Sequence, residues 1–302
     1  MPSTMLQMGQ MHKIHRDQPS AERDLSEYLR YRETLGYHLQ GGLLRKALTL
    51  ARKYGIAHLV TRALTYPNAP WVRFGWYPLT AAYRWMHHLD CVMINGRKMR
   101  MGHFSSAGER IVEIPLALDF LKRRMGRGKR CLEIGNVLAH HFPFPHDVVD
   151  KYEVHEGVTN VDVLRFQPSQ PYDLIISVST LEHIGFDEAD FDLNKTERTL
   201  RHLYENCLGP GGWMFLTMPL GYHPEVDGFS LDGRLGFIPV HIFERTSVFR
   251  TWSEVRPSRE WLPPLYSYSR HVTHAFSVWE VQKPLGNPSL IPASELVQAT
   301  LT

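Results

Sequence analysis

Acidic and small residues follow two neighbouring apolar runs in the middle of the sequence. The first run, Cys131–Ile134, ends at Gly135 and Asn136, and the second ends on Asp150. A glycine turn lets the backbone approach a ligand closely, and a carboxylate accepts hydrogen bonds from ribose hydroxyls. Because this pairing is typical of doubly wound sheets, the spacing predicts a nucleoside site at the carboxyl ends of two parallel strands.

The residues around Gly135 also discriminate between cofactors. A dinucleotide fold needs G-x-G-x-x-G, and a P-loop needs G-x-x-x-x-G-K-[ST]. Neither is present, since no second glycine follows Gly135 within six residues. Glu133 instead precedes the glycine by two residues, and a carboxylate suits a cationic ligand end and repels a diphosphate. This pattern favours S-adenosylmethionine (SAM) over NAD.

Five motifs in order resemble those of class I SAM-dependent methyltransferases over about residues 106–282. They are L-E-I-G at 132–135, V-V-D at 148–150, Y-D-L-I-I-S at 172–177, L-E-H-I at 181–184 and L-G-P-G-G at 208–212. The resemblance implies an α/β fold with a Rossmann-like, seven-stranded, mostly parallel sheet whose last strand is antiparallel. The string E-R-I-V-E-I-P at 109–115 further resembles a bacterial subset associated with glycan or surface-polysaccharide pathways.

The same resemblance implies roles for individual residues. The expected cofactor-binding residues are Glu133, Gly135, Asn136, Asp150, Asp162, Val163, Ser179, Thr180 and Glu182. Asp162 would lie near the adenine amine, and the segment from Ser179 to His183 near the methyl group. His183 is the candidate catalytic base, because its ordinary pKa is about 6.5; the alternative is that it only shapes the pocket. The expected substrate-side residues are Arg110, Tyr222, His223 and Asp227. For Arg110 a surface ion pair is the alternative.

Apolar periodicity and turn residues place the secondary structure. Strands are expected at 91–94 with a hairpin partner at 98–101, and then at 131–134, 147–150, 159–163, 173–179, 213–217 and 278–281. Helices are expected at 116–124 and 196–207, and a long polar loop at 219–227. Pro143 and Pro145 limit any helix after Gly135 to one or two turns.

The sequence divides into an N-terminal helical, basic, aromatic-rich extension (1–105), a methyltransferase domain (106–282) and a tail (283–302). Residues 1–130 carry 22 Lys+Arg and 9 Asp+Glu, a net charge of +13, and the remaining residues carry 12 and 22, a net charge of −10. An anionic partner for the basic part, or packing of the two parts on each other, explains this asymmetry. Two helices are expected between residues 21 and 54.

The aromatic residues between 66 and 90, with arginines interleaved, allow three interpretations. They can form a platform for single-stranded nucleic acid or an interfacial membrane segment. They can equally form a helix packed over the domain or at a homodimer interface.

Several classes of function are disfavoured by what the sequence lacks. No secretory signal and no run of about 18 apolar residues are present, so a transmembrane segment is not expected. Three widely spaced cysteines predict free thiols in the cytoplasm. His140, His141 and His146 lack a partner at metal-ligand spacing such as H-E-x-x-H, so no metal is expected.

The N-P-P-Y motif of enzymes that methylate amino groups of DNA bases or protein glutamine is absent. The sequence thus predicts O-methylation of a small-molecule or sugar acceptor. Two alternatives stay open: an RNA methyltransferase that grips RNA with the basic N-terminal part, and a non-catalytic interaction module.

Overall fold

The computed structural model describes residues 56, 75, 77–86, 91–94, 97–101, 108–142, 145–233, 235–246, 251–256, 263 and 273–286. The predicted helices between 21 and 54 lie outside these residues. Of the aromatic-rich segment, the structure describes mainly α5 (Tyr77–Met86), a helix. The predicted hairpin is confirmed, because β1 (Cys91–Ile94) pairs antiparallel with β2 (Arg97–Arg100).

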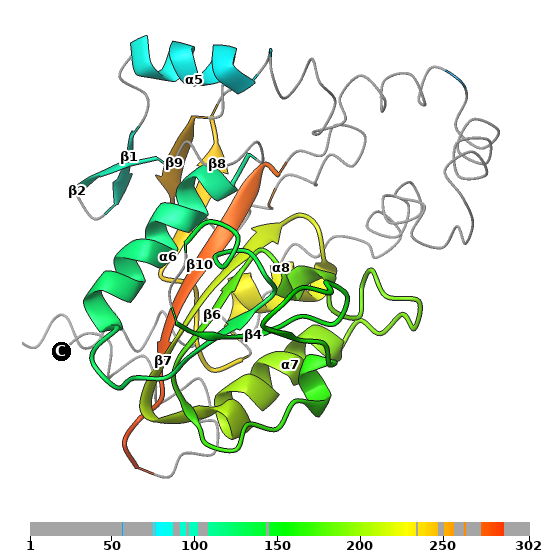
Figure 1. Ribbon diagram of the computed structural model, residues 1–302. Helices are drawn as coiled ribbons and strands as arrows, with labels where there is room; N and C mark the ends of the chain where they lie inside the picture. The colour runs from blue at the N-terminus through cyan, green and yellow to red at the C-terminus, as the bar shows by residue number, and fades with distance from the viewer. Residues whose placement is uncertain are drawn as a thin grey trace, which may run out of the picture.

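The described part of the chain contains an eight-stranded sheet in the order β5-β4-β3-β6-β7-β10-β8-β9 (Figure 1). Its strands are β3 (Cys131–Ile134), β4 (Asp147–Val149), β5 (Val158–Thr159), β6 (Tyr172–Val178), β7 (Leu208–Leu220), β8 (His241–Arg245), β9 (Trp252–Val255) and β10 (Ala275–Gln282). The strands from β5 to β7 are parallel. β10 is antiparallel to both β7 and β8. The predicted α/β sheet with an antiparallel last strand is confirmed, and β9 extends it at the edge.

Helices cover both faces of the sheet, and alternate residues of the strands divide between two cores. The helix α6 (Arg110–Arg124) covers one face, where Phe120 packs against Phe215 of β7 with ring centroids 5.2 Å apart. The helices α7 (Lys195–His202) and α8 (Pro224–Asp232) lie on the other face (Figure 1). There the even-numbered residues of β7 from Met214 to Leu220 enter the second core. The sheet is therefore packed on both faces.

Several elements differ from the sequence-based predictions in extent, among them β10, which runs over Ala275–Gln282 where 278–281 was expected. β5 has only two residues, and a 3-10 turn, η2 (Val163–Arg165), follows it. The helix expected from residue 116 begins at Arg110 and runs through Pro115. The described residues between β3 and β4 form turns where one or two helical turns were expected. β7 begins at Leu208, and Pro210–Gly212 form an irregularity inside it, because its pairing with β6 shifts register there.

The largest correction concerns the loop expected at 219–227. The helix α8 begins at Pro224, a residue suited to a first helical position because it lacks an N–H. The imidazole of His223 accepts a hydrogen bond from the Glu225 amide, and Gly233 ends the helix in a left-handed conformation. The segment after β7 is thus mostly buried helix and not a mobile polar loop.

Lys283 belongs structurally to the sheet domain, although it was assigned to the tail. Its buried ammonium donates to the carbonyls of Tyr204, Glu205 and Leu208, where the helical segment η4 (Leu203–Cys207) ends. A cation suits these unpaired carbonyls. Separately, within the described ranges no helix is long and apolar enough to span a bilayer.

Candidate active site at the carboxyl edge of the sheet

Gly135 and Thr180 bring together the loops that follow β3 and β6. These strands flank the point at which the strand order reverses, where open α/β sheets bind their ligands. Gly135 has a φ of +82°, and a Cβ added there would lie 2.2 Å from Oγ1 of Thr180. Its amide also donates to the carbonyl of Val149 at the end of β4, at 2.9 Å. Only glycine fits this turn, which joins the ends of three strands.

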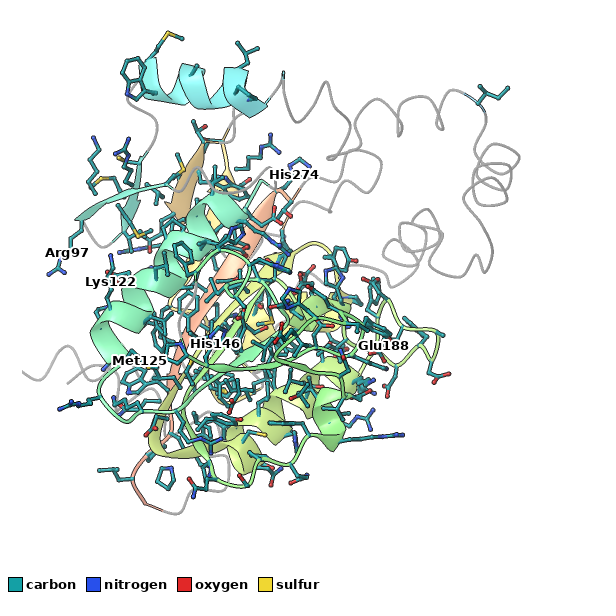
Figure 2. The ribbon with its side chains drawn as sticks, in the orientation of Figure 1. Arg97, Lys122, Met125, His146, Glu188 and His274 are labelled. Carbon is teal, nitrogen blue, oxygen red and sulfur yellow. The ribbon has the colours of Figure 1, made fainter. Side chains whose placement is uncertain are left out.

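Glu133 shapes the turn after β3 from within. Its fully buried carboxylate accepts hydrogen bonds from the amides of Val137, Leu138 and Ala139 at 2.9, 2.5 and 3.2 Å. The imidazole of His146, whose side chain is also buried (Figure 2), lies 2.6 Å from Oε2, the oxygen that also accepts from Ala139. Both carboxylate oxygens therefore have partners, which order the loop after β3, and the expected contact of Glu133 with a cationic ligand end stays a prediction.

Asn136 is joined to the loop after β4. Its side-chain amide donates to Glu153 at 2.7 Å, and His140 lies 2.6 Å from the same carboxylate oxygen. The Oδ1 atom of Asn136 is buried and has no hydrogen-bond partner among the described residues. Glu153 was not singled out from the sequence, although it lies only three residues after Asp150.

Asp150 follows the last residue of β4, and one of its carboxylate oxygens accepts hydrogen bonds from the backbone. Its Oδ1 accepts from the amides of Tyr152 and Glu153, both at 2.8 Å, in the local turn that aspartate favours. These two bonds hold the carboxylate in one orientation. A fixed carboxylate at this strand end is suited to accept hydrogen bonds from a diol.

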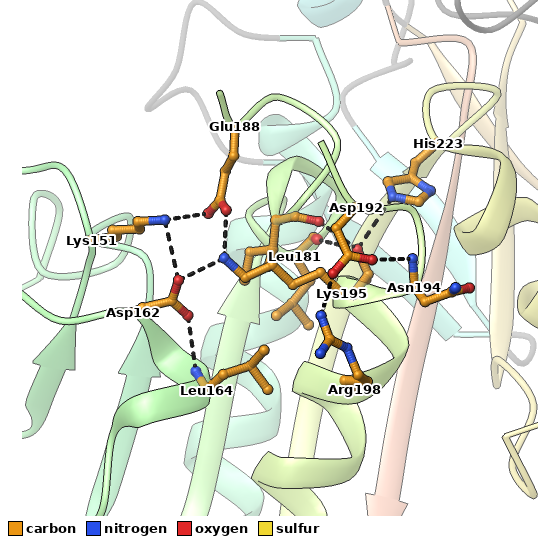
Figure 3. Close-up of polar contacts among 12 residues, drawn as sticks. Lys151, Asp162, Leu164, Leu181, Glu188, Asp192, Asn194, Lys195, Arg198 and His223 are labelled. Carbon is orange, nitrogen blue, oxygen red and sulfur yellow. Dashed lines mark hydrogen bonds and ion pairs between the residues drawn. The ribbon is translucent and has the colours of Figure 1, made fainter. Parts of the chain in front are cut away.

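Asp162 is the centre of a four-residue ion-pair network (Figure 3). Its Oδ2 lies 2.6 Å from Nζ of Lys195 and 3.2 Å from Nζ of Lys151, and both lysines also contact Glu188. Burial opposes ionisation of Asp162, but hydrogen bonds from Lys195 and Lys151 outweigh it and lower the pKa to about 2. The network fastens the loops after β4 and β5 to α7. The structure therefore gives Asp162 partners that compete with the expected adenine amine.

Ser179 ends β6 in a conformation that is uncommon for a residue with a side chain. Its φ is +44°, in the left-handed region. Its hydroxyl donates to Oε1 of Glu113 on α6 at 2.6 Å, and its amide donates to the carbonyl of Thr217 on β7 at 3.0 Å. Glu113 is fully buried, and its Oε2 has no partner among the described residues. Burial raises the pKa of Glu113 to about 8.

His183 is flanked by two carboxylates in the turn η3 (Leu181–His183). Its Nδ1 contacts Asp187, to which the hydroxyl of Tyr222 also donates at 2.5 Å, and its Nε2 lies 3.5 Å from buried Glu182. Burial lowers the pKa of His183, but Glu182 and Asp187 outweigh it and raise it to about 9. Burial likewise raises the pKa of Glu182 to about 7. The imidazole is therefore oriented through Nδ1, while Nε2 belongs to a half-exposed side chain.

Tyr222, His223 and Asp227, expected on the substrate side, have mainly structural contacts. His223 is fully buried, caps α8 and packs against Phe186, with ring centroids 4.7 Å apart and the rings tilted by 43°. Burial, followed by the charge of His183, lowers the pKa of His223 to about 3, so the imidazole is neutral. Asp227 accepts from the amide of Gly221 at 2.8 Å. Tyr222 reaches the His183 cluster through its hydroxyl.

Arg110 is the first residue of α6, and its charge acts on Glu113, Glu182 and His183. It therefore lies at the same edge as the loop after β6. Val163 is buried in the core under η2, where its side chain supports the loop after β5. The cysteines Cys131 and Cys207 are buried free thiols. In the described ranges, no group of three or more His, Cys, Asp or Glu residues could hold a metal ion.

Comparison with models of protein families and with curated proteins finds no match. Among solved structures, a sugar N-methyltransferase from a Streptoalloteichus species is 19% identical, with a TM-score of 0.26 over 34% of this chain and 46% of its own. The cyclase SpnF is 16% identical, with a TM-score of 0.26 over 34% of this chain and 44% of its own. The N-methyltransferase NodS from Bradyrhizobium japonicum is 16% identical, with a TM-score of 0.37 over 58% and 96%.

The chain spans about half the length of the first two structures. Similarity this low carries no argument about the reaction. The chain's own sheet has parallel strands followed by an antiparallel last strand, and ordered motifs lie at its carboxyl edge. The chain has the fold of class I SAM-dependent methyltransferases.

Proposed function

We propose that this protein binds SAM at the carboxyl edge of β3 and β4 and transfers its methyl group to a small-molecule or sugar acceptor, most simply to a hydroxyl. The observation that carries the proposal is the turn at Gly135, whose φ of +82° and contact with Thr180 exclude a side chain. This bare backbone faces the strand end that carries Asp150, as a nucleoside site requires. Bound SAM would supply a methyl group activated by a sulfonium.

The residues present fit such a cofactor. Asp150 is held by two backbone amides in a fixed orientation, in which it can accept hydrogen bonds from ribose hydroxyls. Asn136 contributes a buried oxygen that has no partner in the described part of the chain and can accept a further hydrogen bond. Glu133 keeps the intervening loop in place. A rigid, pre-formed edge of this kind contributes to methyl transfer by alignment of donor and acceptor.

His183 can remove a proton from an acceptor hydroxyl through Nε2. Asp187 fixes the ring through Nδ1, as an orienting carboxylate does for other catalytic imidazoles. A pKa of about 9 means that the basic, neutral form increases as the pH rises towards 9. His183 would therefore act as a base mainly in alkaline solution or once an acceptor displaces one of its carboxylate neighbours. We place this chemistry in the cytoplasm, where free thiols persist.

Calorimetry with S-adenosylhomocysteine tests the proposal directly. We expect micromolar binding to the full chain and at least tenfold weaker binding to Asp150→Ala, equivalent to roughly 1.4 kcal/mol. Glu156→Ala is the matched control, because Glu156 is an exposed acid on the same loop. Absence of heat and of a thermal shift at millimolar ligand would refute the cofactor and favour the non-catalytic module. A steep salt dependence of RNA binding would favour the RNA methyltransferase.

A further inference from the structure

A buried acid on α6 has no role in the function proposed above. Glu113 is 0% exposed, and the cation nearest to it along the helix, Arg110, makes no ion pair with it among the contacts of the described residues. A buried carboxyl group without a paired cation is costly, and a leucine would fill the space at lower cost. The contacts of Glu113 should therefore explain why an acid is buried at this position.

Those contacts lead to the centre of the candidate site. Oε1 of Glu113 receives the hydroxyl of Ser179 at 2.6 Å, across 66 positions of sequence. Ser179 has the positive φ of +44°, and the next residue, Thr180, is the one that packs onto Gly135. A positive φ at a serine persists only where surrounding contacts hold it. The amide of Ser179 is held by Thr217, and its side chain is held by Glu113.

We propose that Glu113 is a positioning residue: its buried carboxyl group holds Ser179 in the left-handed conformation that places Thr180 against the Gly135 turn. Glu113 on α6 contacts Ser179 at the end of β6, and the adjacent Thr180 contacts Gly135 at the end of β3. Glu113 does not touch the ligand in this proposal. It fixes the relative position of the two strand ends between which the cofactor is proposed to bind, so the last step rests on the proposed function.

The neighbourhood of Glu113 is consistent with a neutral hydrogen-bonding acid. Burial raises the pKa of Glu113 and the charge of Glu109 raises it further, whereas Ser179, Arg110 and Thr217 lower it by smaller amounts. A neutral group can be imitated by glutamine, which keeps an oxygen for the Ser179 hydroxyl. Alanine cannot keep that contact. Glycine at position 179 would adopt the positive φ without support.

Hydrogen exchange of the ligand-free protein tests the proposal without any cofactor. In Glu113→Ala we expect the amides of Ser179, His183 and Ile184, which are hydrogen-bonded in the structure, to exchange at least tenfold faster than in the parent. Glu113→Gln should exchange like the parent. Ser179→Gly should restore slow exchange when combined with Glu113→Ala. Asp119→Ala, an exposed acid on the same helix, is the control and should change nothing.

Calorimetry with S-adenosylhomocysteine then follows the same variants. We expect at least tenfold weaker binding in Glu113→Ala, parent affinity in Glu113→Gln and recovery in the double variant. Parent-like exchange in Glu113→Ala, or failure of Ser179→Gly to rescue it, would overturn the proposal. If Glu113→Ala does not fold, Ser179→Ala removes the same hydrogen bond and carries the same expectations. Failure of the parent to bind S-adenosylhomocysteine would refute the cofactor proposal alone, because hydrogen exchange of the ligand-free protein tests the positioning role of Glu113 without any cofactor.

Discussion

The ionisation of Glu113 makes a quantitative prediction about stability and pH. Its pKa is about 8 in the folded protein against an ordinary value of 4.5, and burial is the main cause. Because the folded pKa is raised, the folded state binds more protons than the unfolded state between these two values. The stabilising contribution is therefore complete below about pH 4.5 and is lost as the pH rises towards 8. Each pH unit within this window costs about 1.4 kcal/mol.

Glu113→Gln removes this titration and leaves the volume unchanged. From pH 5 to pH 7.5 the parent should lose about 3 kcal/mol of unfolding free energy relative to the variant. The glutamine adds an unpaired buried N–H₂ at a cost of about 1–3 kcal/mol, but that cost does not vary with pH. The two curves of unfolding free energy against pH should therefore converge or cross. The unfolding free energy of the variant, relative to that of the parent, should increase with each rise in pH.

Urea denaturation followed by circular dichroism, at four pH values between 5 and 7.5 and constant ionic strength, measures the difference. Other titrating groups, including the histidines, are common to both proteins and cancel. Parallel curves would refute the reasoning, because they would mean that Glu113 is ionised in the folded state and compensated by Arg110. The same result would remove the neutral hydrogen-bonding acid from the positioning proposal.

Three further predictions concern the remainder of the edge. Gly135→Ala would place its Cβ 2.2 Å from a side-chain oxygen of the loop after β6, so it should lose at least about 2 kcal/mol in urea denaturation and all binding of S-adenosylhomocysteine. Gly157→Ala, with the same φ of +82° and no atom within 4 Å, should lose only about 1 kcal/mol. Lys195→Met leaves two carboxylates to share one lysine and should cost about 2–3 kcal/mol by the same assay. The pKa of His183, about 9, should fall by at least one unit in Asp187→Asn, as measured by NMR titration; an unchanged value would contradict the assigned contact.

The strands at the centre of the sheet could be predicted closely because their sequences are apolar runs that end at glycine or acid. β3 matches the predicted 131–134, and β4 and β6 agree with their predictions to within one residue at each end. The extent of β7 could not be predicted, because Pro210–Gly212 signal a turn in any local reading. In the structure the amide of Gly211 donates to the carbonyl of Lys283. This partner is distant in the sequence, so local sequence does not reveal it.

α8 could have been found from signals that are present in the sequence. Pro224 at the first helical position, acids in the first turn and Gly233 just past the end are a recognised set of helix boundaries. The polar composition of residues 219–227 outweighed them in the prediction of a loop. Burial of this segment against β7 and α7 is a tertiary effect that polar composition conceals.

The acids at the carboxyl edge illustrate what local sequence cannot supply. Position at or after the end of a strand predicts that a carboxylate lies at this edge, and the structure agrees for Glu133 within β3 and for Asp150 and Asp162. It does not predict whether the oxygens of that carboxylate are already committed. Glu133 is committed to loop amides and Asp162 to two lysines, whereas Asp150 has only its Oδ1 in hydrogen bonds of the described residues.

Whether its oxygens already have partners decides what each acid can do. A carboxylate with a full set of hydrogen bonds gains little from binding a ligand, because it must first give up those bonds. Glu133 and Asp162 hold loops in place through these contacts, and Asp150 is the acid to which the proposed function gives the ribose hydrogen bonds. Glu113 extends the argument to the interior. It lies on no strand end and belongs to no expected site, yet its hydrogen bond with Ser179 holds the residue next to Thr180, which contacts the Gly135 turn. A partner 66 positions away in the sequence determines its role, and only the fold brings the two together.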